Sequence, residues 1–220
     1  MRRIVFFDLD GTLTDAGPGI KASINYALNK MNLAELGRDS DWVVGPSLWG
    51  TFKKLGVIEE RLDEAVNLYR DRYNVKGYIE NSVYEGIPDQ LATLKSVGYL
   101  LCVATAKPTI SAISILEYFE LRQYFSYEFG SNLDGSLSDK SALLKHALEV
   151  TGIDPKDSLM IGDREYDIFG AKSNLIKSIG VSYGYGRKNE LKEAYADCLI
   201  ETPMELVGAK SNYYLFKVIL

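Results

Sequence analysis

Histidine, cysteine and long apolar runs are scarce in this sequence, and each scarcity argues against a class of protein. The single histidine among 220 residues, His146, sits inside a helical pattern, which argues against a histidine-activated nucleophile and a histidine-rich metal site. The two cysteines, Cys102 and Cys198, lie in apolar runs, which predicts buried free thiols rather than a disulfide framework. No apolar run approaches the roughly 20 residues that cross a membrane.

The sequence also lacks an excess of positive charge and a leader-like beginning. Its formal net charge is -5, which gives no electrostatic footprint for a nucleic acid or an anionic membrane surface. Met1, Arg2 and Arg3 lead straight into a short strand that ends in acids, which is not the pattern of a signal peptide. We therefore expect a cytoplasmic protein with no nucleic-acid or membrane partner, and we expect the apolar residues 211–220 to pack on the domain edge.

The sequence does contain enough apolar residues for a full core, arranged as alternating strands and helices. Hydrophobic residues make up 46% of the chain, and its length suits one large domain or one domain with an insertion. The patterns predict strands at 3–7, 99–104, 127–130, 158–161, 176–181 and 198–200, and helices at 87–97, 108–118, 138–150, 167–172, 189–196 and 204–207. Repeated strand–helix units predict an α/β fold, a Rossmann-like parallel sheet with helices on both faces.

Residues 15–81 interrupt this alternation just after the first strand. Apolar residues at helical spacing predict helices at 20–31, 47–55 and 59–73. We therefore expect an α/β core domain made of residues 1–14 and 82–220, and a small all-helical domain inserted at residues 15–81.

Two carboxylates follow the first predicted strand and are separated by one residue. Side chains at i and i+2 of a strand point the same way, so Asp8 and Asp10 share a side. Burying two acids there costs desolvation and repulsion, and a divalent cation relieves both. The alternative is a charged strand end beside a solvated turn at Gly11.

A threonine and a lysine lie at the ends of later predicted strands and helices. Thr105 ends a strand and precedes a helix start, which makes an anion site of phosphate size from its hydroxyl and neighbouring N–H groups. A threonine that caps the next helix is the alternative. Lys140 stands at another helix start, and Lys107, closer to Thr105 in sequence, competes with it for the same role. Most such lysines are solvated surface residues.

A second acidic pair follows the strand predicted at 158–161. Asp163 comes directly after that strand and Asp167 follows one helical turn later, so like charges face each other and require a cation or a lysine nearby. Oxygen-only ligands suit Mg²⁺. The alternative is a pair of helix N-terminal acids stabilised by the helix macrodipole.

Together these pieces describe acyl-phosphate chemistry. One aspartate attacks phosphorus, a second acid protonates the leaving oxygen, and Mg²⁺, a lysine and a hydroxyl hold the phosphoryl oxygens. The order along the chain is Asp-x-Asp-Gly-Thr, a threonine after a strand, a lysine before a helix, and Gly-Asp-x-x-x-Asp. That order resembles the haloacid dehalogenase-like (HAD) superfamily, and specifically its phosphatases with a helical cap inserted after the first motif.

The resemblance implies a role for each candidate residue. Asp8 would be the nucleophile and Asp10 the general acid and base. Asp8, the backbone carbonyl of Asp10, and Asp163 would bind Mg²⁺, with Asp167 supporting the metal site or Lys140. The phosphate or substrate would contact Gly11, Thr12, Thr105, Ala106, Lys107 and Lys140, of which Thr105 and Lys140 would also take part in catalysis. Residues 15–81 would be the cap that closes over the substrate.

The closer resemblance is to the phosphoglycolate phosphatase-like group, whose relatives include 5′-nucleotidases. The stretches that carry it are Gly45-Pro46-Ser47-Leu48, Tyr69-Arg70-Asp71-Arg72-Tyr73, Val83-Tyr84-Glu85-Gly86-Ile87 and Tyr183-Gly184-Tyr185-Gly186. It implies a Mg²⁺-dependent phosphatase that acts on a small phosphorylated metabolite as a monomer or homodimer. A β-phosphoglucomutase-like mutase and a catalytically inactive phosphate-binding module are the alternatives.

Overall fold

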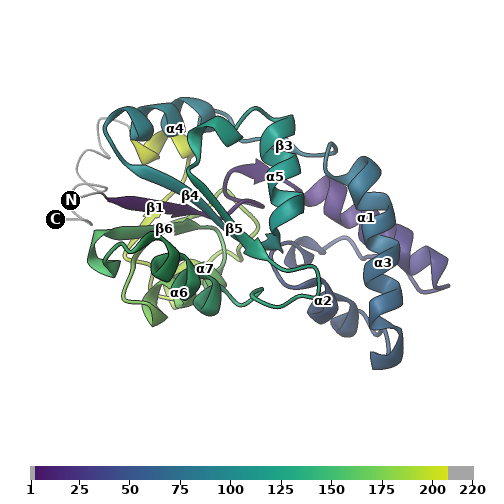
Figure 1. Ribbon diagram of the computed structural model, residues 1–220. Helices are drawn as coiled ribbons and strands as arrows, with labels where there is room; N and C mark the ends of the chain where they lie inside the picture. The colour runs from purple at the N-terminus through teal and green to yellow at the C-terminus, as the bar shows by residue number, and fades with distance from the viewer. Residues whose placement is uncertain (1–2, 208–220) are drawn as a thin grey trace.

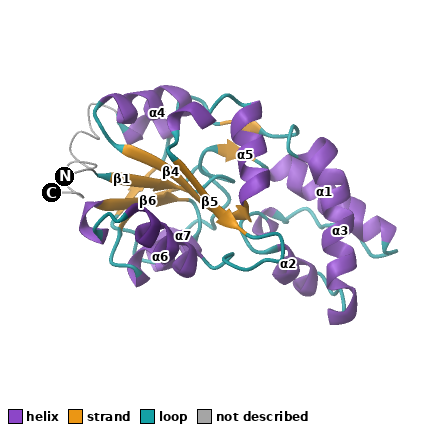
Figure 2. Cartoon of the chain, viewed as in Figure 1, coloured by secondary structure: helices purple, strands orange, loops and turns teal. Residues whose placement is uncertain are grey.

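A six-stranded parallel sheet forms the centre of the protein (Figures 1 and 2). The computed structural model describes residues 3–207. The strand order is β5-β4-β1-β6-β7-β8, so β1 lies between β4 and β6. The strands are β1 (Ile4–Phe7), β4 (Leu100–Pro108), β5 (Tyr127–Ser131), β6 (Ser158–Gly162), β7 (Lys177–Val181) and β8 (Cys198–Ile200). This order confirms the predicted Rossmann-like α/β fold.

Helices cover both faces of the sheet because β1 is apolar on both sides. Val5 and Phe7 belong to the core beneath α4 (Ile87–Ser96) and α5 (Thr109–Tyr118). Ile4 and Phe6 point the other way, into a second core with α6 (Lys140–Thr151) and α7 (Glu165–Ser173). Figure 1 shows α4 above the sheet and α6 and α7 below it.

The predicted elements are present, and they differ from the prediction mainly at their ends. β4 continues to Pro108, where it pairs with Ser131 after a register shift, so α5 begins one residue later than predicted. The helix predicted at 189–196 is only α8 (Glu190–Glu193), because Tyr195 adopts a positive φ of 59° that ends it. The helix predicted at 204–207 is a short 3₁₀ turn at Pro203–Leu206.

Three helices from residues 15–81 gather beyond the carboxyl ends of the strands (Figure 1). They are α1 (Gly17–Lys30), α2 (Leu48–Lys54) and α3 (Leu62–Arg72), and α3 continues into a π-helical turn at Tyr73–Gly77. We call residues 15–81 the helical insertion. α2 begins one residue after the predicted start, because Ser47 is its N-cap and the Ser47 hydroxyl accepts a hydrogen bond from Gly50 N at 3.2 Å.

A two-stranded antiparallel sheet joins the insertion to the rest of the chain. β2 (Thr14–Asp15) leaves the central sheet and β3 (Ser82–Val83) returns to it, with Thr14 opposite Val83. The sequence did not predict this pair, because two residues are too few to show an alternating pattern. The outgoing and returning segments therefore lie side by side.

Other sequence predictions concern the cysteines and the apolar segments. Cys102 and Cys198 are both buried and free, as predicted. Among residues 3–207, no helix has the length and apolar character needed to cross a membrane. The tail at residues 211–220 lies outside the described residues.

Candidate active site

The carboxyl ends of β1, β4 and β6 meet at one place, because these strands are neighbours in the sheet. Asp8 follows β1, Thr105 lies near the end of β4, and Asp163 follows β6. A pocket of about 1110 Å³ opens there between the strand ends and the helical insertion. Ligands of open α/β sheets bind at this edge, so this pocket is the candidate active site.

The turn after β1 folds directly over Asp163. Gly11 has a φ of +88°, and a Cβ atom there would lie 2.2 Å from Asp163 Oδ2, so only glycine fits. The Thr12 hydroxyl donates a hydrogen bond to Asp163 Oδ1 at 3.3 Å. Gly11 and Thr12 therefore shape the carboxylate cluster, and neither of them lines the pocket itself.

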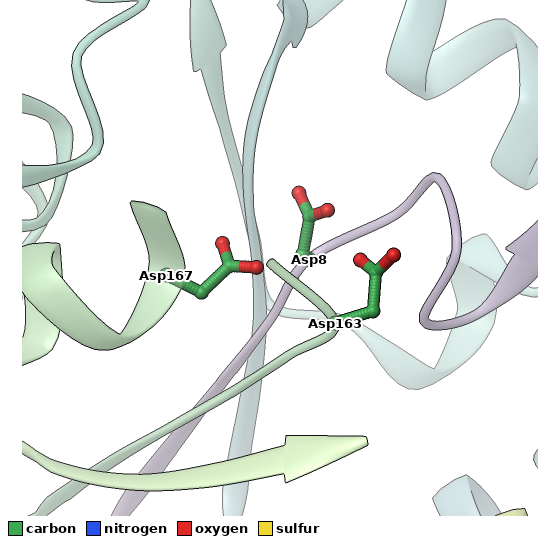
Figure 3. Close-up of side chains that lie close together, drawn as sticks. All are labelled: Asp8, Asp163 and Asp167. Carbon is green, nitrogen blue, oxygen red and sulfur yellow. The ribbon is translucent and has the colours of Figure 1, made fainter. Parts of the chain in front are cut away.

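Asp8, Asp163 and Asp167 form a compact cluster in which one oxygen from each lies within 4.8 Å of the others. Their carboxyl groups point to the same side of the strand ends (Figure 3). All three are buried. Burial, with the charge of Asp8 added, raises the pKa of Asp163 well above its usual value, and burial raises the pKa of Asp167 to about 6. The cluster thus favours bound protons or a cation, and its oxygen-only donor set fits a hard divalent metal ion.

Lys140 supplies positive charge to this cluster. Its Nζ lies 2.9 Å from Asp8 Oδ1 and 2.7 Å from Asp167 Oδ1, and it donates a further hydrogen bond to the Ala104 carbonyl at 2.6 Å. These contacts occupy all of its donor hydrogens. Burial works to lower the pKa of Lys140, but the two carboxylates outweigh it and raise that pKa. Lys140 begins α6, and Asp139 caps that helix by accepting from Ala142 N at 2.9 Å.

Asp10 is not part of this cluster, and it pairs with the second lysine. Lys107 Nζ lies 2.9 Å from Asp10 Oδ2. The other oxygen, Oδ1, is buried and has no hydrogen-bond partner among residues 3–207. Burial raises the pKa of Asp10, although Lys107 acts to lower it, so this carboxyl takes up a proton more readily than an exposed aspartic acid.

The remaining predicted residues come from the end of β4. Thr105 is buried, and its hydroxyl accepts a hydrogen bond from Lys107 N at 3.3 Å. Thr105, Ala106 and Lys107 all line the pocket. The structure therefore brings the predicted catalytic, phosphate-binding and metal-binding residues to one edge of the sheet.

Several residues that shape the site were not predicted from the sequence. Tyr185 N donates to Asp163 Oδ2 at 2.8 Å, while its hydroxyl contacts Asp15 and accepts from Gly17 N at 2.8 Å. Its motif, Tyr-Gly-Tyr-Gly, was visible in the sequence, but nothing there indicated that it ties the carboxylate cluster to the start of the insertion. Arg164 was also missed; it is buried, bonds Glu190 at 2.8 Å and donates to the Val44 carbonyl.

The insertion side of the pocket is aromatic and cationic. Lys54 lies 3.9 Å from the ring centre of Trp42, and the Arg70 guanidinium lies 5.3 Å from that of Trp49. Arg70 also donates to the Leu133 carbonyl at 2.6 Å, which links the insertion to the loop after β5. All four side chains line the pocket.

Known proteins are similar to this chain over most of its length. Residues 5–181 match the family model described as haloacid dehalogenase-like hydrolase. A 5′-nucleotidase of Pseudomonas aeruginosa is 41% identical over 190 residues, which are 86% of this chain and 86% of that protein. Phosphoglycolate phosphatase 1 of the same organism is 27% identical over 214 residues, covering 93% of this chain and 78% of that protein. The crystal structure of a predicted phosphatase from Clostridium acetobutylicum is 43% identical, covers 98% of this chain and 99% of its own, and superposes with a TM-score of 0.91. The chain belongs to the haloacid dehalogenase-like hydrolase family, as its motifs predicted.

Proposed function

We propose that the protein is a Mg²⁺-dependent phosphatase that hydrolyses small phosphomonoesters through an aspartyl phosphate on Asp8. The observation that carries this proposal is the buried cluster of Asp8, Asp163 and Asp167 beside Lys140, at the open edge of the sheet. The names of the relatives, a 5′-nucleotidase and a phosphoglycolate phosphatase, support the same reaction class.

The metal would be held by Asp8, Asp163 and the backbone carbonyl of Asp10, with Asp167 supporting the site through Lys140. Lys107 pairs with the Asp10 carboxylate outside the cluster of Asp8, Asp163 and Asp167, so we assign the metal contact of Asp10 to its backbone carbonyl. When bound, Mg²⁺ would neutralise charge on the phosphoryl oxygens and on the cluster.

The reaction would proceed through two successive displacements at phosphorus. An Asp8 oxygen forms a bond to phosphorus while the bond to the leaving oxygen breaks, and Asp10 gives its proton to that oxygen. A water molecule then attacks the same phosphorus, Asp10 takes a proton from it, and the bond to Asp8 breaks to release inorganic phosphate. Asp8 and Asp10 return to their starting states.

The phosphoryl oxygens would be held at the end of β4 and the start of α6. Thr105 offers its hydroxyl, Ala106 its backbone, and Lys140 its charge, with Lys107 on the same wall. The turn at Gly11 and Thr12 holds Asp163 in place. These donors are fixed before the reaction, which is the condition for stabilising charge in a transition state.

We further propose that residues 15–81 are a cap domain that closes over the substrate, and that residues 1–14 and 82–220 are the core domain. The paired segments β2 and β3 support this division, because two adjacent connections make a hinge. The pocket lies between the two parts, so movement of the cap would open and close it.

The partner of this site would be a small phosphorylated metabolite. Tryptophan and arginine side chains on the cap side of the pocket suit a leaving group with a ring or a negative charge. We place the protein in the cytoplasm as a monomer or homodimer, without a nucleic-acid or membrane partner, in keeping with its net charge of -5.

Phosphate release from a panel of esters tests the proposal. The panel contains phosphoglycolate, nucleoside 5′-monophosphates, phosphotyrosine, glucose 1-phosphate and p-nitrophenyl phosphate, each with Mg²⁺ and with EDTA. Release that requires the metal is expected, and the ranking of kcat/KM names the leaving group. Isomerisation of glucose 1-phosphate with little free phosphate would point to a mutase instead, and no turnover of any ester would point to a binding module.

A further inference from the structure

Lys107 lines the pocket, and its side chain contacts Asp10 and Tyr73, which are not members of the carboxylate cluster. Its Nζ lies 2.9 Å from Asp10 Oδ2 and donates to the Tyr73 hydroxyl at 3.0 Å. The same atom lies 4.4 Å from the centre of the Tyr73 ring. Lys107 is therefore held between the proposed general acid and one residue of the helical insertion, and its side chain is only 8% exposed.

The two oxygens of Asp10 are in unlike surroundings. Oδ2 is occupied by Lys107, whose ammonium group can donate hydrogen bonds but cannot accept one. Oδ1 is buried and has no partner within residues 3–207. A proton on Asp10 must therefore sit on Oδ1, because Oδ2 already faces a donor. Oδ1 is then the oxygen left to serve the leaving group.

Tyr73 is held by neighbours within the insertion. Its ring stacks on Tyr69 with centres 5.2 Å apart, and both are buried. It begins the π-helical turn Tyr73–Gly77, and a Cβ atom on Gly77 would lie 2.6 Å from the Tyr73 ring. Such turns are frequent at functional sites. The insertion therefore places the Tyr73 hydroxyl at a fixed position beside Lys107.

We propose that Lys107 is a positioning residue for Asp10, and that Tyr73 holds it in place when the insertion lies over the core. This inference rests on the proposed phosphatase function and refines it. Lys107 then acts on the leaving oxygen through Asp10, rather than on the phosphoryl group as the sequence suggested. Closure of the insertion over the core would then also orient the general acid, Asp10.

The dependence of rate on leaving group separates the two roles of Lys107. A general acid matters most when the leaving oxygen is basic, as in an alkyl phosphate, and little when it is p-nitrophenolate. The ratio kcat/KM reports the steps up to departure of the leaving group, so later hydrolysis of the aspartyl phosphate does not enter it. A lysine that only binds phosphate affects both substrates equally.

The experiment measures kcat/KM of Lys107→Met on p-nitrophenyl phosphate and on whichever of phosphoglycolate and AMP the wild type prefers, with the inhibition constant of inorganic phosphate. We expect roughly a 10- to 100-fold loss on the alkyl ester, at most about a three-fold loss on the aryl ester, and an unchanged inhibition constant. In an Asp10→Asn background, Lys107→Met should cause no further loss. Lys53→Met removes an exposed charge of the insertion and serves as the matched control.

Tyr73→Phe provides a second variant that keeps the ring and the packing but removes the hydroxyl. It should show a smaller loss with the same preference for the aryl ester, and it decides the question if Lys107→Met fails to fold. Equal losses on both esters, or a weaker inhibition by phosphate, would overturn the inference while leaving the phosphatase intact. A wild type that releases no phosphate from any ester would overturn the proposed function itself.

Discussion

Two buried lysine–aspartate pairs of the core hold their charges differently, because one lies within the carboxylate cluster and the other also contacts the helical insertion. On the core side, Lys140 contacts Asp8, Asp167 and a backbone carbonyl, so all of its donors are used. Toward the insertion, Lys107 of β4 bridges Asp10 of the core and Tyr73 of the insertion, and one oxygen of Asp10 has no partner within residues 3–207. In the first pair, Lys140 neutralises the charges of Asp8 and Asp167. In the second pair, Asp10 Oδ1 is left free to interact with the leaving group.

The difference follows from where each residue comes in the fold. The core side is built from strand ends and the start of α6, which pack on one rigid sheet. Lys107 and Asp10 belong to the core as well, but their partner Tyr73 belongs to helices that β2 and β3 join to that sheet. We infer that Lys140 and the carboxylate cluster fix the phosphoryl group and the metal, while the Asp10–Lys107 pair, which contacts the insertion, acts on the leaving group.

The largest effect on stability is expected from Lys140→Met. This change leaves the buried carboxylates of Asp8 and Asp167 without their counter-charge, which costs about 3 kcal/mol of unfolding free energy in the metal-free protein. The melting temperature should fall by roughly 6–12 °C. Lys107→Met, which removes the counter-charge of a single carboxylate, should lower it less. Equal melting temperatures for the two variants would contradict the distinction between the two sides.

Magnesium should have an intermediate effect. An ion that binds only the folded protein adds about 2.7 kcal/mol of stability at 100 times its dissociation constant, which is a rise of roughly 5–11 °C in melting temperature. Asp163→Asn should abolish the rise, and EDTA should reverse it.

Asp10→Asn is the matched control for this measurement, because the proposed metal contact of Asp10 is its backbone carbonyl. It should retain most of the rise caused by Mg²⁺. A rise that survives Asp163→Asn would show that the ion binds elsewhere.

The smallest effect is expected from Arg70→Ala on the insertion side. Arg70 lies over Trp49 and donates to the Leu133 carbonyl, but it is partly exposed. A cation–π contact of this kind contributes about 0.5–1 kcal/mol, so the melting temperature should fall by roughly 1–4 °C. Arg61→Ala, which removes an exposed ion pair within the insertion, is the control. A fall as large as that of Lys140→Met would show that the insertion side is as tightly built as the core side.

The sequence predicted the core side of the site because its residues follow buried strands. Asp8, Thr105 and Asp163 end apolar runs, and neighbouring parallel strands bring such ends together. Lys140 was harder to predict, because a lysine at a helix start is usually solvated. Its burial depends on how α6 packs on the sheet, which no local pattern encodes.

The insertion side and its connections were largely beyond prediction. Tyr73 and Lys107 are 34 residues apart and meet only through tertiary packing. β2 and β3 are too short to produce a pattern, and the role of Tyr185 depends on a contact across 22 residues with Asp163. Resemblance to the family supplied the roles of the core residues, but it gave no partner for Asp10.

The central claim is that Asp8 carries the phosphoryl group, and covalent labelling tests it most directly. The enzyme is mixed with phosphorus-32-labelled p-nitrophenyl phosphate and Mg²⁺, quenched in acid, digested and mapped. We predict label on the peptide that contains Asp8, released by hydroxylamine as an acyl phosphate is, retained in Asp10→Asn and absent from a folded Asp8→Asn protein. Label on another residue, or turnover by Asp8→Asn, would contradict the account.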